Sequence, residues 1–401
     1  MNIPHDRFCV LPWISLEASP IGTVRPCCLA DDEIVDDSGK KFNLRNANLG
    51  DVQRSQHMTQ LRQEFLTDQK PNTCRKCWNE EESGRTSKRM HTLDRLKHIL
   101  GDQTWNLDAK PLMFLDLKLG NICNLKCRIC GSWSSSQYAA EEIKWTPREH
   151  QKQTFAYEML QAGNWPRQNN HFWQQIDQHI CDIRYIEFTG GEPFMIQEHF
   201  DMLQGIVDRG VAHQVEIHYN TNGTIFPEHA PEIWQHFKTV EIAVSIDDVG
   251  ERFEYQRANA DWIEVLKNMA KFKQLRATMS NIQLQCCTTV NVFNVRYLKY
   301  VADWINYQTF DFVYWNIMHD AWYFSIASLP TSAKVELSAY LDNCNPPERF
   351  KTEFKQIKTF MLNGNSSDGA ETCKKIQETD QRRNQSFKKT FPEMAAILKI
   401  A

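Results

Sequence analysis

Three cysteines have the types and spacing of metal ligands. Cys123, Cys127 and Cys130 are separated by three and then two residues, directly after an apolar run that ends in Leu-Gly-Asn. Cysteine thiolates hold iron–sulfur clusters, and a cubane cluster that only transfers electrons usually takes four of them. Three thiolates leave one iron unligated. Such an open coordination position indicates a metal centre that does chemistry rather than one that only supports the fold.

A second motif lies downstream, where a short β-type run at residues 185–188 leads into Gly190, Gly191, Glu192 and Pro193. Glycine permits positive φ angles and the close approach of a ligand to the backbone. The carboxylate that follows, and exposed backbone carbonyls, are hydrogen-bond acceptors for an ammonium group. Taken alone, this motif is only a turn, and the three cysteines alone also fit part of a zinc site.

In this order, with a β-type run before each, the two motifs resemble the radical S-adenosylmethionine (radical SAM) superfamily. The resemblance implies that the three cysteines bind a 4Fe–4S cluster whose fourth iron is chelated by the amino and carboxylate groups of SAM. It also implies that the segment from Gly190 to Pro193 lies along the amino group of the methionine moiety. Ile129 stands where the family often has an aromatic residue against the adenine, and an aliphatic side chain can pack there in the same way.

A further group of cysteines precedes the first motif. Its members are Cys9, Cys27, Cys28, Cys74 and Cys77. A hairpin is predicted between residues 14 and 27, because β-type residues flank a turn rich in serine, proline and glycine. This hairpin would bring the first two cysteines of the group close together. A helix predicted over residues 52–66 would deliver the last two from the loop that follows it.

This group resembles the twitch module, the shortened form of the SPASM extension that carries one auxiliary iron–sulfur cluster in some radical SAM enzymes. The family pattern corresponds to Cys9, Gly22, Cys27, Cys74 and Cys77. The resemblance implies a second 4Fe–4S cluster closed by these four cysteines, with Cys27 preferred over its neighbour because it satisfies the glycine spacing. The module generally follows the barrel, whereas here it precedes it. A structural zinc site with four cysteines is the alternative.

Apolar runs rich in β-branched residues alternate with helical patterns between residues 110 and 320. The runs are residues 113–118, 185–188, 215–219, 241–245, 283–290 and 312–317. Repeated βα units imply an α/β fold with a parallel sheet and right-handed crossovers. These units match the partial (β/α)6 TIM-like barrel that radical SAM proteins share. A small cysteine-rich α+β module is expected before the barrel and a helical extension after it.

Active sites of parallel barrels gather at the C-terminal ends of the strands. Both motifs follow strands in this way, and so do Asn220 and Asn222 after the third predicted strand. By resemblance to SPASM-type enzymes, Ser245 would bond a ribose hydroxyl of SAM, and the guanidinium of Arg257 its carboxylate. Asn291, after the fifth strand, is a further candidate for contact with the adenosine. The alternatives are an Asn-Gly turn at Asn222 and a surface cation at Arg257.

The resemblance implies an oxidoreductase that reductively cleaves SAM to a 5′-deoxyadenosyl radical, which takes a hydrogen atom from a substrate. The auxiliary cluster would accept the electron left on the substrate, and a donor such as flavodoxin or ferredoxin would supply the first electron. Enzymes with such modules act on peptides, sugars or nucleotides, so the substrate stays open. Candidates for substrate contact near the last strand are Tyr314, Trp315, His319 and Asp320. A histidine beside aromatic residues is often only a packed core residue, and no general base is identified.

The composition is that of a globular protein, with 401 residues of which 41% are hydrophobic and 24% charged. The net charge of -4 argues against direct nucleic-acid binding by the whole surface, and no apolar run is long enough to cross a bilayer. The 13 cysteines, an odd number, fit metal ligation in a reducing cytoplasm better than a disulfide framework. A cytoplasmic protein is therefore expected.

Three segments are predicted: a twitch-like auxiliary module at residues 1–108, the radical SAM barrel at 109–322 and a helical extension at 323–401. The extension is interrupted by a polar, glycine-containing stretch at residues 363–369. It would either cover the mouth of the barrel or recruit a partner protein. The alternative for the whole chain is a non-catalytic zinc-binding scaffold that uses its cysteines only for folding.

Overall fold

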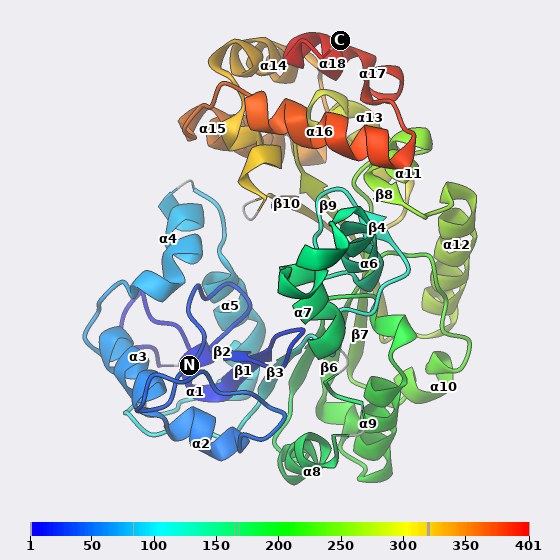
Figure 1. Ribbon diagram of the computed structural model, residues 1–401. Coiled ribbons are helices and arrows are strands. Elements are labelled where there is room, and N and C mark those ends of the chain that lie inside the picture. Colours follow the sequence, from blue (N-terminus) through cyan, green and yellow to red (C-terminus); the bar gives the residue numbers. More distant parts are fainter. Residues whose placement is uncertain (1, 83, 164, 168, 319–320, 401) are drawn as a thin grey trace. The chain divides into compact units, whose positions relative to one another are not determined.

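The computed structural model describes residues 2–82, 84–163, 165–167, 169–318 and 321–400 (Figure 1). The chain divides into two compact units, which are described one at a time. Unit 1 comprises Met1–Asn124, Ser132–Asn220 and Pro227–Glu241, and unit 2 comprises Leu125–Gly131, Thr221–Phe226 and Ile242–Ala401. The predicted division into auxiliary module, barrel and extension stays a prediction.

A mainly parallel sheet forms the centre of unit 1. Its strands, in spatial order, are β6 (Glu216–Thr221), β5 (Tyr185–Phe188), β3 (Phe114–Leu117), β1 (Ser15–Ala18) and β2 (Val24–Arg25). The antiparallel pair β1 and β2 is the predicted hairpin. The sequence did not predict that β1 also pairs in parallel with β3. As a result, the first segment of the chain continues the same sheet as the predicted barrel strands.

Helices of unit 1 follow and precede these strands (Figure 1). They are α1 (Leu11–Ile14), α2 (Leu49–Arg54), α3 (Gln56–Leu66), α4 (Arg75–Glu82), α5 (Lys88–Leu100), α6 (Ser136–Trp145), α7 (Phe155–Ala162), α8 (Asn170–His179), α9 (Gln197–Asp208) and α10 (Ala230–Trp234), with short 3₁₀ turns that include η1 (Asn72–Cys74) and η3 (Pro193–Met195). The helix predicted over residues 52–66 is divided at Ser55. The Ser55 hydroxyl accepts the Met58 N–H and so caps the start of α3.

Unit 2 holds the later strands and the helices of the C-terminal extension. Its strands are β10 (Phe312–Ile317), β9 (Ile282–Val290) and β7 (Thr239–Ser245), in that order, and the separate pair β4 (Lys126–Cys127) and β8 (Arg257–Ala258). The first residues of β7, up to Glu241, belong to unit 1. Its helices are α11 (Glu251–Gln256), α12 (Trp262–Thr278), α13 (Leu298–Tyr307), α14 (Thr331–Asn343), α15 (Lys351–Asn363), α16 (Ala370–Arg383), α17 (Phe387–Thr390) and α18 (Pro392–Leu398), with the 3₁₀ turn η8 (Glu348–Phe350). Strands β9 and β10 are parallel.

Each of the six predicted barrel strands occurs, as β3, β5, β6, β7, β9 and β10, and the α/β fold class is confirmed. The helical stripes behave as amphipathic patterns require. Phe200, Leu203 and Ile206 of α9 are buried, and the chain turns after the helix at Gly210, whose φ is +70°. The polar stretch predicted within the extension separates α15 from α16.

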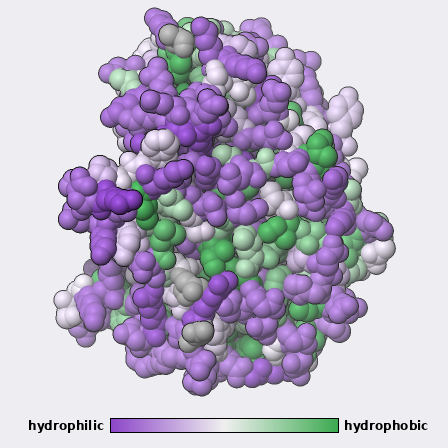
Figure 2. All heavy atoms as spheres, turned by 45° about the vertical axis from the view of Figure 1, so that its right-hand side comes forward, coloured by the Kyte–Doolittle hydropathy of each residue, from purple (hydrophilic) through white to green (hydrophobic). Residues whose placement is uncertain are grey.

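The face drawn in Figure 2 is mostly hydrophilic, with smaller groups of hydrophobic side chains between the polar ones. Within the described ranges, every helix is too short or too polar to cross a membrane.

Candidate metal centres and active site

Four N-terminal cysteines line one small, mainly apolar cavity in unit 1. Cys9 precedes α1, Cys27 follows β2, Cys74 ends η1 and Cys77 lies in α4. The other lining residues are Leu11, Leu29, Ala30, Phe65, Lys88 and Arg89. The hairpin and the short helices thus bring together four thiols from segments far apart in the sequence.

The environment of these thiols fits a bound metal cluster. Burial first, and then the neighbouring Cys27, raise the pKa of Cys77 to about 12. The pKa values of Cys9 and Cys74 are also raised, by burial first and then by the surrounding thiols. On their own these groups stay protonated at neutral pH, whereas a positively charged metal core favours thiolates. Four converging soft donors in apolar surroundings are the donor set of a closed iron–sulfur or zinc centre.

Cys28 faces a different environment from Cys27. It is not among the residues that line the cysteine cavity. Its Sγ atom and carboxylate oxygens of Asp116 and Glu187 all lie within 4.8 Å of one another. The two adjacent cysteines therefore have different neighbours: Cys27 lines the thiol cavity, and Cys28 lies with Asp116 and Glu187.

A row of charged side chains crosses the sheet of unit 1 at one level. Glu17 of β1 is the register partner of Asp116 in β3, which is the partner of Glu187 in β5, which in turn is the partner of His218 in β6. Each of these residues is at most 9% exposed. Ionised groups are this deeply buried only when partners compensate them.

Two lysines compensate the acids of this row. Lys118 Nζ lies 2.5 Å from Glu17 Oε1, and Lys88 Nζ lies 2.5 Å from both carboxylate oxygens of Glu187. Burial opposes ionisation of Asp116, but Lys118 and Lys88 outweigh it and lower the pKa of this carboxyl. Lys88 begins α5 and also lines the cysteine cavity. The row and the cavity are therefore neighbours that share a side chain.

The row continues to Glu241 on β7. His218 Nδ1 lies 3.0 Å from Glu241 Oε1, and Arg95 Nη2 donates to Glu241 Oε2 at 2.9 Å. Burial alone would raise the pKa of Glu241, but the hydrogen bond from His218 and the charge of Arg95 lower it from 4.5 to about 2. The carboxylate is therefore ionised at neutral pH.

Replacing Glu241 by Gln is expected to destabilise the protein in a pH-dependent way. A carboxyl whose pKa is depressed on folding contributes stability above its unfolded pKa and loses it as the pH falls toward its folded pKa. At pH 7 the free energy of unfolding should fall by about 3 kcal/mol. The difference from the unmodified protein should shrink between about pH 4.5 and pH 2. Denaturant unfolding of both proteins at pH 7 and at about pH 3.5, roughly one unit below the unfolded pKa, measures the difference in free energy of unfolding.

The control for this substitution is Glu264→Gln. Glu264 forms an exposed pair with Lys267 at 3.3 Å on α12. Exposed pairs contribute little, so its effect should stay below about 0.5 kcal/mol at either pH. An equal loss in the two variants would contradict the role given to the buried carboxylate.

The glycine pair packs against the segment before the first cysteine of the loop. Gly190 and Gly191 have φ angles of +75° and +61°, which favour glycine. A Cβ atom on Gly191 would lie 2.4 Å from the backbone oxygen of Ile122, and Glu192 N–H donates to that oxygen at 2.7 Å. The Glu192 carboxylate is fully buried and accepts the Phe194 N–H at 3.4 Å, capping η3. The structure thus directs the acid into the protein and keeps the glycine backbone close to the cysteine loop.

Cys127 and Cys130 belong to a short segment of unit 2. Cys127, in β4, is the register partner of Arg257 in β8. Cys130 N–H donates to the Cys127 carbonyl at 3.1 Å, which closes a turn, and the Cys130 residue is exposed. The pKa of Cys127 is lowered, first by a hydrogen bond with Cys130 and then, against the effect of burial, by Arg257. This environment favours the thiolate form that a metal ligand requires.

Arg257 is fixed by a carboxylate that the sequence had not pointed to. Its Nε and Nη2 atoms lie 3.0 and 2.7 Å from Asp247 Oδ2, and the other oxygen of Asp247 accepts the Thr289 N–H at 2.9 Å. Asp247 is fully buried. The alternative of a surface cation is therefore wrong for Arg257. A signal was present, since Asp247 follows the fourth strand by two residues, where functional residues of parallel folds gather.

Two other predicted contacts have structural partners. Asn222 Oδ1 accepts hydrogen bonds from the N–H and hydroxyl of Thr224, as in an Asx turn. Asn291 is fully buried, donates to the Thr289 carbonyl at 2.9 Å and accepts the Phe293 N–H at 2.8 Å. Both side chains therefore shape the turns after their strands. Asn220, Ser245 and Ile129 are each half-buried.

Two of the four candidates for substrate contact, Tyr314 and Trp315, are among the described residues. Trp315 is 3% exposed and packs edge-on against Phe350 and Phe354, at 5.3 and 5.8 Å between ring centroids. It is therefore a core residue between β10 and the helices of the extension. Tyr314, its neighbour on β10, is half-buried. His319 and Asp320 lie outside the described residues.

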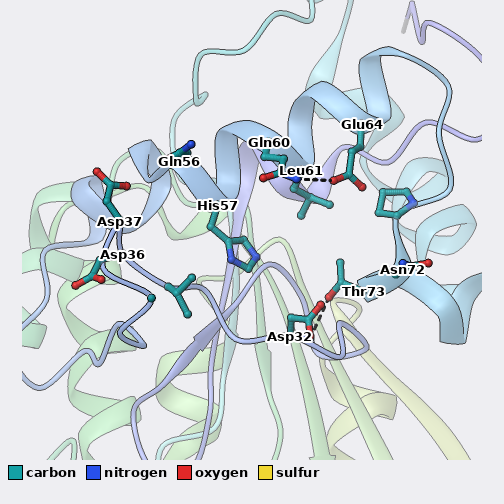
Figure 3. Close-up of a pocket in the computed structure, with 13 residues that line it drawn as sticks. Asp32, Asp36, Asp37, Gln56, His57, Gln60, Leu61, Glu64, Asn72 and Thr73 are labelled. Atoms are coloured by element: carbon teal, nitrogen blue, oxygen red, sulfur yellow. Dashed lines mark hydrogen bonds between the residues drawn. The ribbon is translucent and has the colours of Figure 1, made fainter.

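A hollow of about 440 Å³ lies on the surface of the N-terminal segment. Figure 3 shows His57 reaching into it from α3, across from Asp32 and Thr73. Asp36 at its rim accepts hydrogen bonds from Ser38 and Lys40 and so stabilises its own turn. No residue that the sequence marked for chemistry lines this hollow.

The buried charged row was missed by sequence reasoning, although it left a signal. Acids of the row lie between apolar residues of their strands, as in Leu115-Asp116-Leu117 and Ile186-Glu187-Phe188. A lone charge inside a buried strand requires a partner, and that requirement was not used.

Comparisons with known proteins agree with both cysteine sets. Residues 117–284 match the model of the radical SAM superfamily. Residues 9–78, which contain Cys9, Cys27, Cys74 and Cys77, match the SPASM model, described as an iron–sulfur cluster-binding domain. No curated protein matches the chain.

Solved structures show only distant likeness. "Native anSMEcpe with bound AdoMet and Cp18Cys peptide" is 17% identical, with 58% of this chain and 59% of that chain covered and a TM-score of 0.37. "Structure of TYW1 with a lysine-pyruvate adduct bound" is 11% identical, with 45% and 54% covered and a TM-score of 0.23. The chain thus spans less than two thirds of the length of either structure.

Proposed function

We propose that the chain is a radical SAM enzyme with a SPASM-type iron–sulfur domain, and that it cleaves SAM reductively to start radical chemistry on a substrate still to be identified. Its cofactors are SAM, a 4Fe–4S cluster and an auxiliary iron–sulfur cluster. The observation that carries the proposal is the presence of two distinct cysteine sets in one chain. One is a loop of three cysteines and the other a separate cavity of four.

We assign the SAM-binding cluster to Cys123, Cys127 and Cys130. An open iron needs a set of three ligands, which this loop supplies. The lowered pKa of Cys127 and its turn with Cys130 support the assignment of these two. When bound, SAM and its cluster supply a 5′-deoxyadenosyl radical that removes a hydrogen atom from the substrate, and the auxiliary cluster supplies an acceptor for the electron left behind.

The auxiliary cluster is assigned to Cys9, Cys27, Cys74 and Cys77. The lining of a single cavity by these four, and the orientation of Cys28 toward Asp116 and Glu187, support the choice of Cys27. Four protein ligands leave no open position, so direct substrate binding there is not proposed.

The residues around the first cluster are given positioning roles. The backbone at Gly190 and Gly191, rather than the capping carboxylate of Glu192, accepts hydrogen bonds from the SAM ammonium. Arg257, oriented by Asp247, is assigned to the SAM carboxylate. Pro193, Asn220, Ser245 and Ile129 keep their predicted contacts, whereas the side chains of Asn222 and Asn291 are engaged in turns.

The proposed reaction involves an electron donor and a substrate. An electron donor is required, and we propose a flavodoxin or ferredoxin in the cytoplasm. The substrate is proposed to be a peptide, sugar or nucleotide-like molecule.

Iron and sulfide analysis of anaerobically purified protein tests the proposal. About eight irons per chain are expected, four for each cubane, and 5′-deoxyadenosine should form after reduction in the presence of SAM. A colourless protein that contains zinc and does not cleave SAM would instead identify a zinc-binding scaffold.

A further inference from the structure

One side chain of the segment that carries Cys127 and Cys130 lies in the interior of unit 2. This side chain is Arg128, which is 3% exposed. Its backbone N–H donates to the Gln256 carbonyl at 2.8 Å. A buried guanidinium needs partners for its charge and its N–H groups. Within the described residues, Nε and Nη2 of Arg128 have hydrogen-bond partners, whereas Nη1 has none. Those partners fix the position of the loop.

The partners of Arg128 come from α11 and from the C-terminal extension. The guanidinium stacks on the ring of Tyr255 at 3.7 Å, and its Nε donates to the Tyr255 carbonyl at 3.2 Å. Its Nη2 donates to Asp380 Oδ1 at 2.5 Å and to Gln385 Oε1 at 2.9 Å. Asp380 lies in α16 and is 252 residues away in sequence. The planar fork of arginine suits this combination of stacking and hydrogen bonding, which lysine cannot reproduce.

Asp380 connects several elements at once. Its Oδ1 atom also accepts the Tyr255 hydroxyl at 2.6 Å, and its Oδ2 atom accepts the Phe387 N–H at 2.6 Å. Phe387 is 1% exposed and packs against Phe391 and Tyr255, at 5.3 and 6.2 Å between ring centroids. The carboxylate is therefore held from the core side of the extension and is not a mobile surface group.

These contacts give the extension a role other than covering the barrel mouth or recruiting a partner. We infer that Asp380 is a positioning residue for the SAM-binding cluster, because it neutralises and orients Arg128 and thereby holds the segment between Cys127 and Cys130. This inference rests on the proposed assignment of these cysteines as cluster ligands. Groups that orient metal ligands commonly change metal affinity or activity by about 10–100-fold when removed.

The test compares Asp380→Asn and Arg128→Lys with a control on the same helix, Glu371→Gln. The first keeps the size of the side chain and removes its charge, and the second keeps the charge and loses the fork and the stacking. Glu371 forms only a half-exposed pair with Lys375 at 3.7 Å. Iron content, the electron paramagnetic resonance spectrum of each reduced cluster with and without SAM, and their midpoint potentials are measured on the reconstituted full chain.

Both test variants should bind iron at the three-cysteine site about 10–100-fold more weakly, or lose the spectral change on SAM addition, while the auxiliary cluster keeps its spectrum and potential. Glu371→Gln should resemble the unmodified protein. Unchanged loading, SAM response and potential in both test variants would overturn the inference. If Asp380→Asn loses the signals of both clusters, Tyr255→Phe replaces it in the test, because this change removes only the hydroxyl that donates to Asp380 Oδ1. Weaker iron binding or a lost SAM response at the three-cysteine site alone then supports the inference, and unchanged loading, SAM response and potential overturn it. A wrong ligand assignment can be told apart from a wrong role of Asp380, because Cys127→Ala would then retain the SAM-responsive signal.

Discussion

Cys127→Ala is expected to abolish formation of 5′-deoxyadenosine. Cys127 is buried and is the register partner of Arg257, and the pKa of its thiol is lowered. Two remaining thiolates cannot hold a cubane cluster with one open iron, so SAM would lose both its binding partner and its source of an electron. The measurement is chromatographic quantification of 5′-deoxyadenosine after anaerobic reduction with SAM present.

Iron content shows whether the loss has the proposed cause. The variant should retain about four irons, those of the auxiliary cluster, and its spectrum. Cys181→Ala is the matched control, because Cys181 is exposed and takes no part in either cysteine set. SAM cleavage at the unmodified rate in Cys127→Ala, with full iron, would exclude the assignment of this residue.

The parts of the site that the sequence predicted are those in which chemistry fixes both residue type and spacing. A cluster loop needs thiolates at a few short separations, and a close backbone approach needs glycine, so Cys123 to Cys130 and Gly190 to Gly191 were recognisable. The strands were recognisable because buried parallel strands are continuous apolar runs. Their C-terminal ends then indicated where polar residues of the site are expected.

The parts that were missed depend on the direction of a side chain or on distant pairing. Asn291 donates to the Thr289 carbonyl and to Gln256 Oε1 and accepts the Phe293 N–H, and its place after a strand reveals none of these partners. Arg128 and Asp380 are 252 residues apart in the sequence, so no local pattern predicts their ion pair. Likewise, the parallel pairing of β1 with β3 requires the tertiary fold, because β-strand propensity does not identify a partner strand.

The predicted helix over residues 52–66 shows the same limit at short range. The apolar stripe of Met58, Leu61 and Phe65 correctly indicated a buried helical face. The break at Ser55 arises because its hydroxyl accepts the Met58 N–H and donates to the Val52 carbonyl. Serine competes with the backbone for hydrogen bonds in this way, and the hydrophobic period carries no information about it.

Cys27→Ala and Cys28→Ala should show which of these two adjacent cysteines is a ligand of the auxiliary cluster. Cys27 lines the cavity with Cys9, Cys74 and Cys77, whereas Cys28 lies with Asp116 and Glu187. Loss of one of four ligands in an apolar cavity leaves an incompletely coordinated cluster, so Cys27→Ala should fall from about eight irons to about four. Cys28→Ala should keep about eight.

The same variants test whether the two clusters have different roles, SAM cleavage at one and electron acceptance at the other. Because the three-cysteine loop is untouched, Cys27→Ala should still form 5′-deoxyadenosine, and Cys74→Ala should do the same while substrate turnover is lost. Iron analysis and the spectrum of the auxiliary cluster are read alongside 5′-deoxyadenosine formation. A normal auxiliary spectrum in Cys27→Ala together with its loss in Cys28→Ala would reverse the ligand assignment. If Cys27→Ala keeps the SAM-responsive signal but no longer cleaves SAM, then SAM cleavage needs the auxiliary cluster. That result would contradict the proposed role of this cluster as acceptor of the electron left on the substrate.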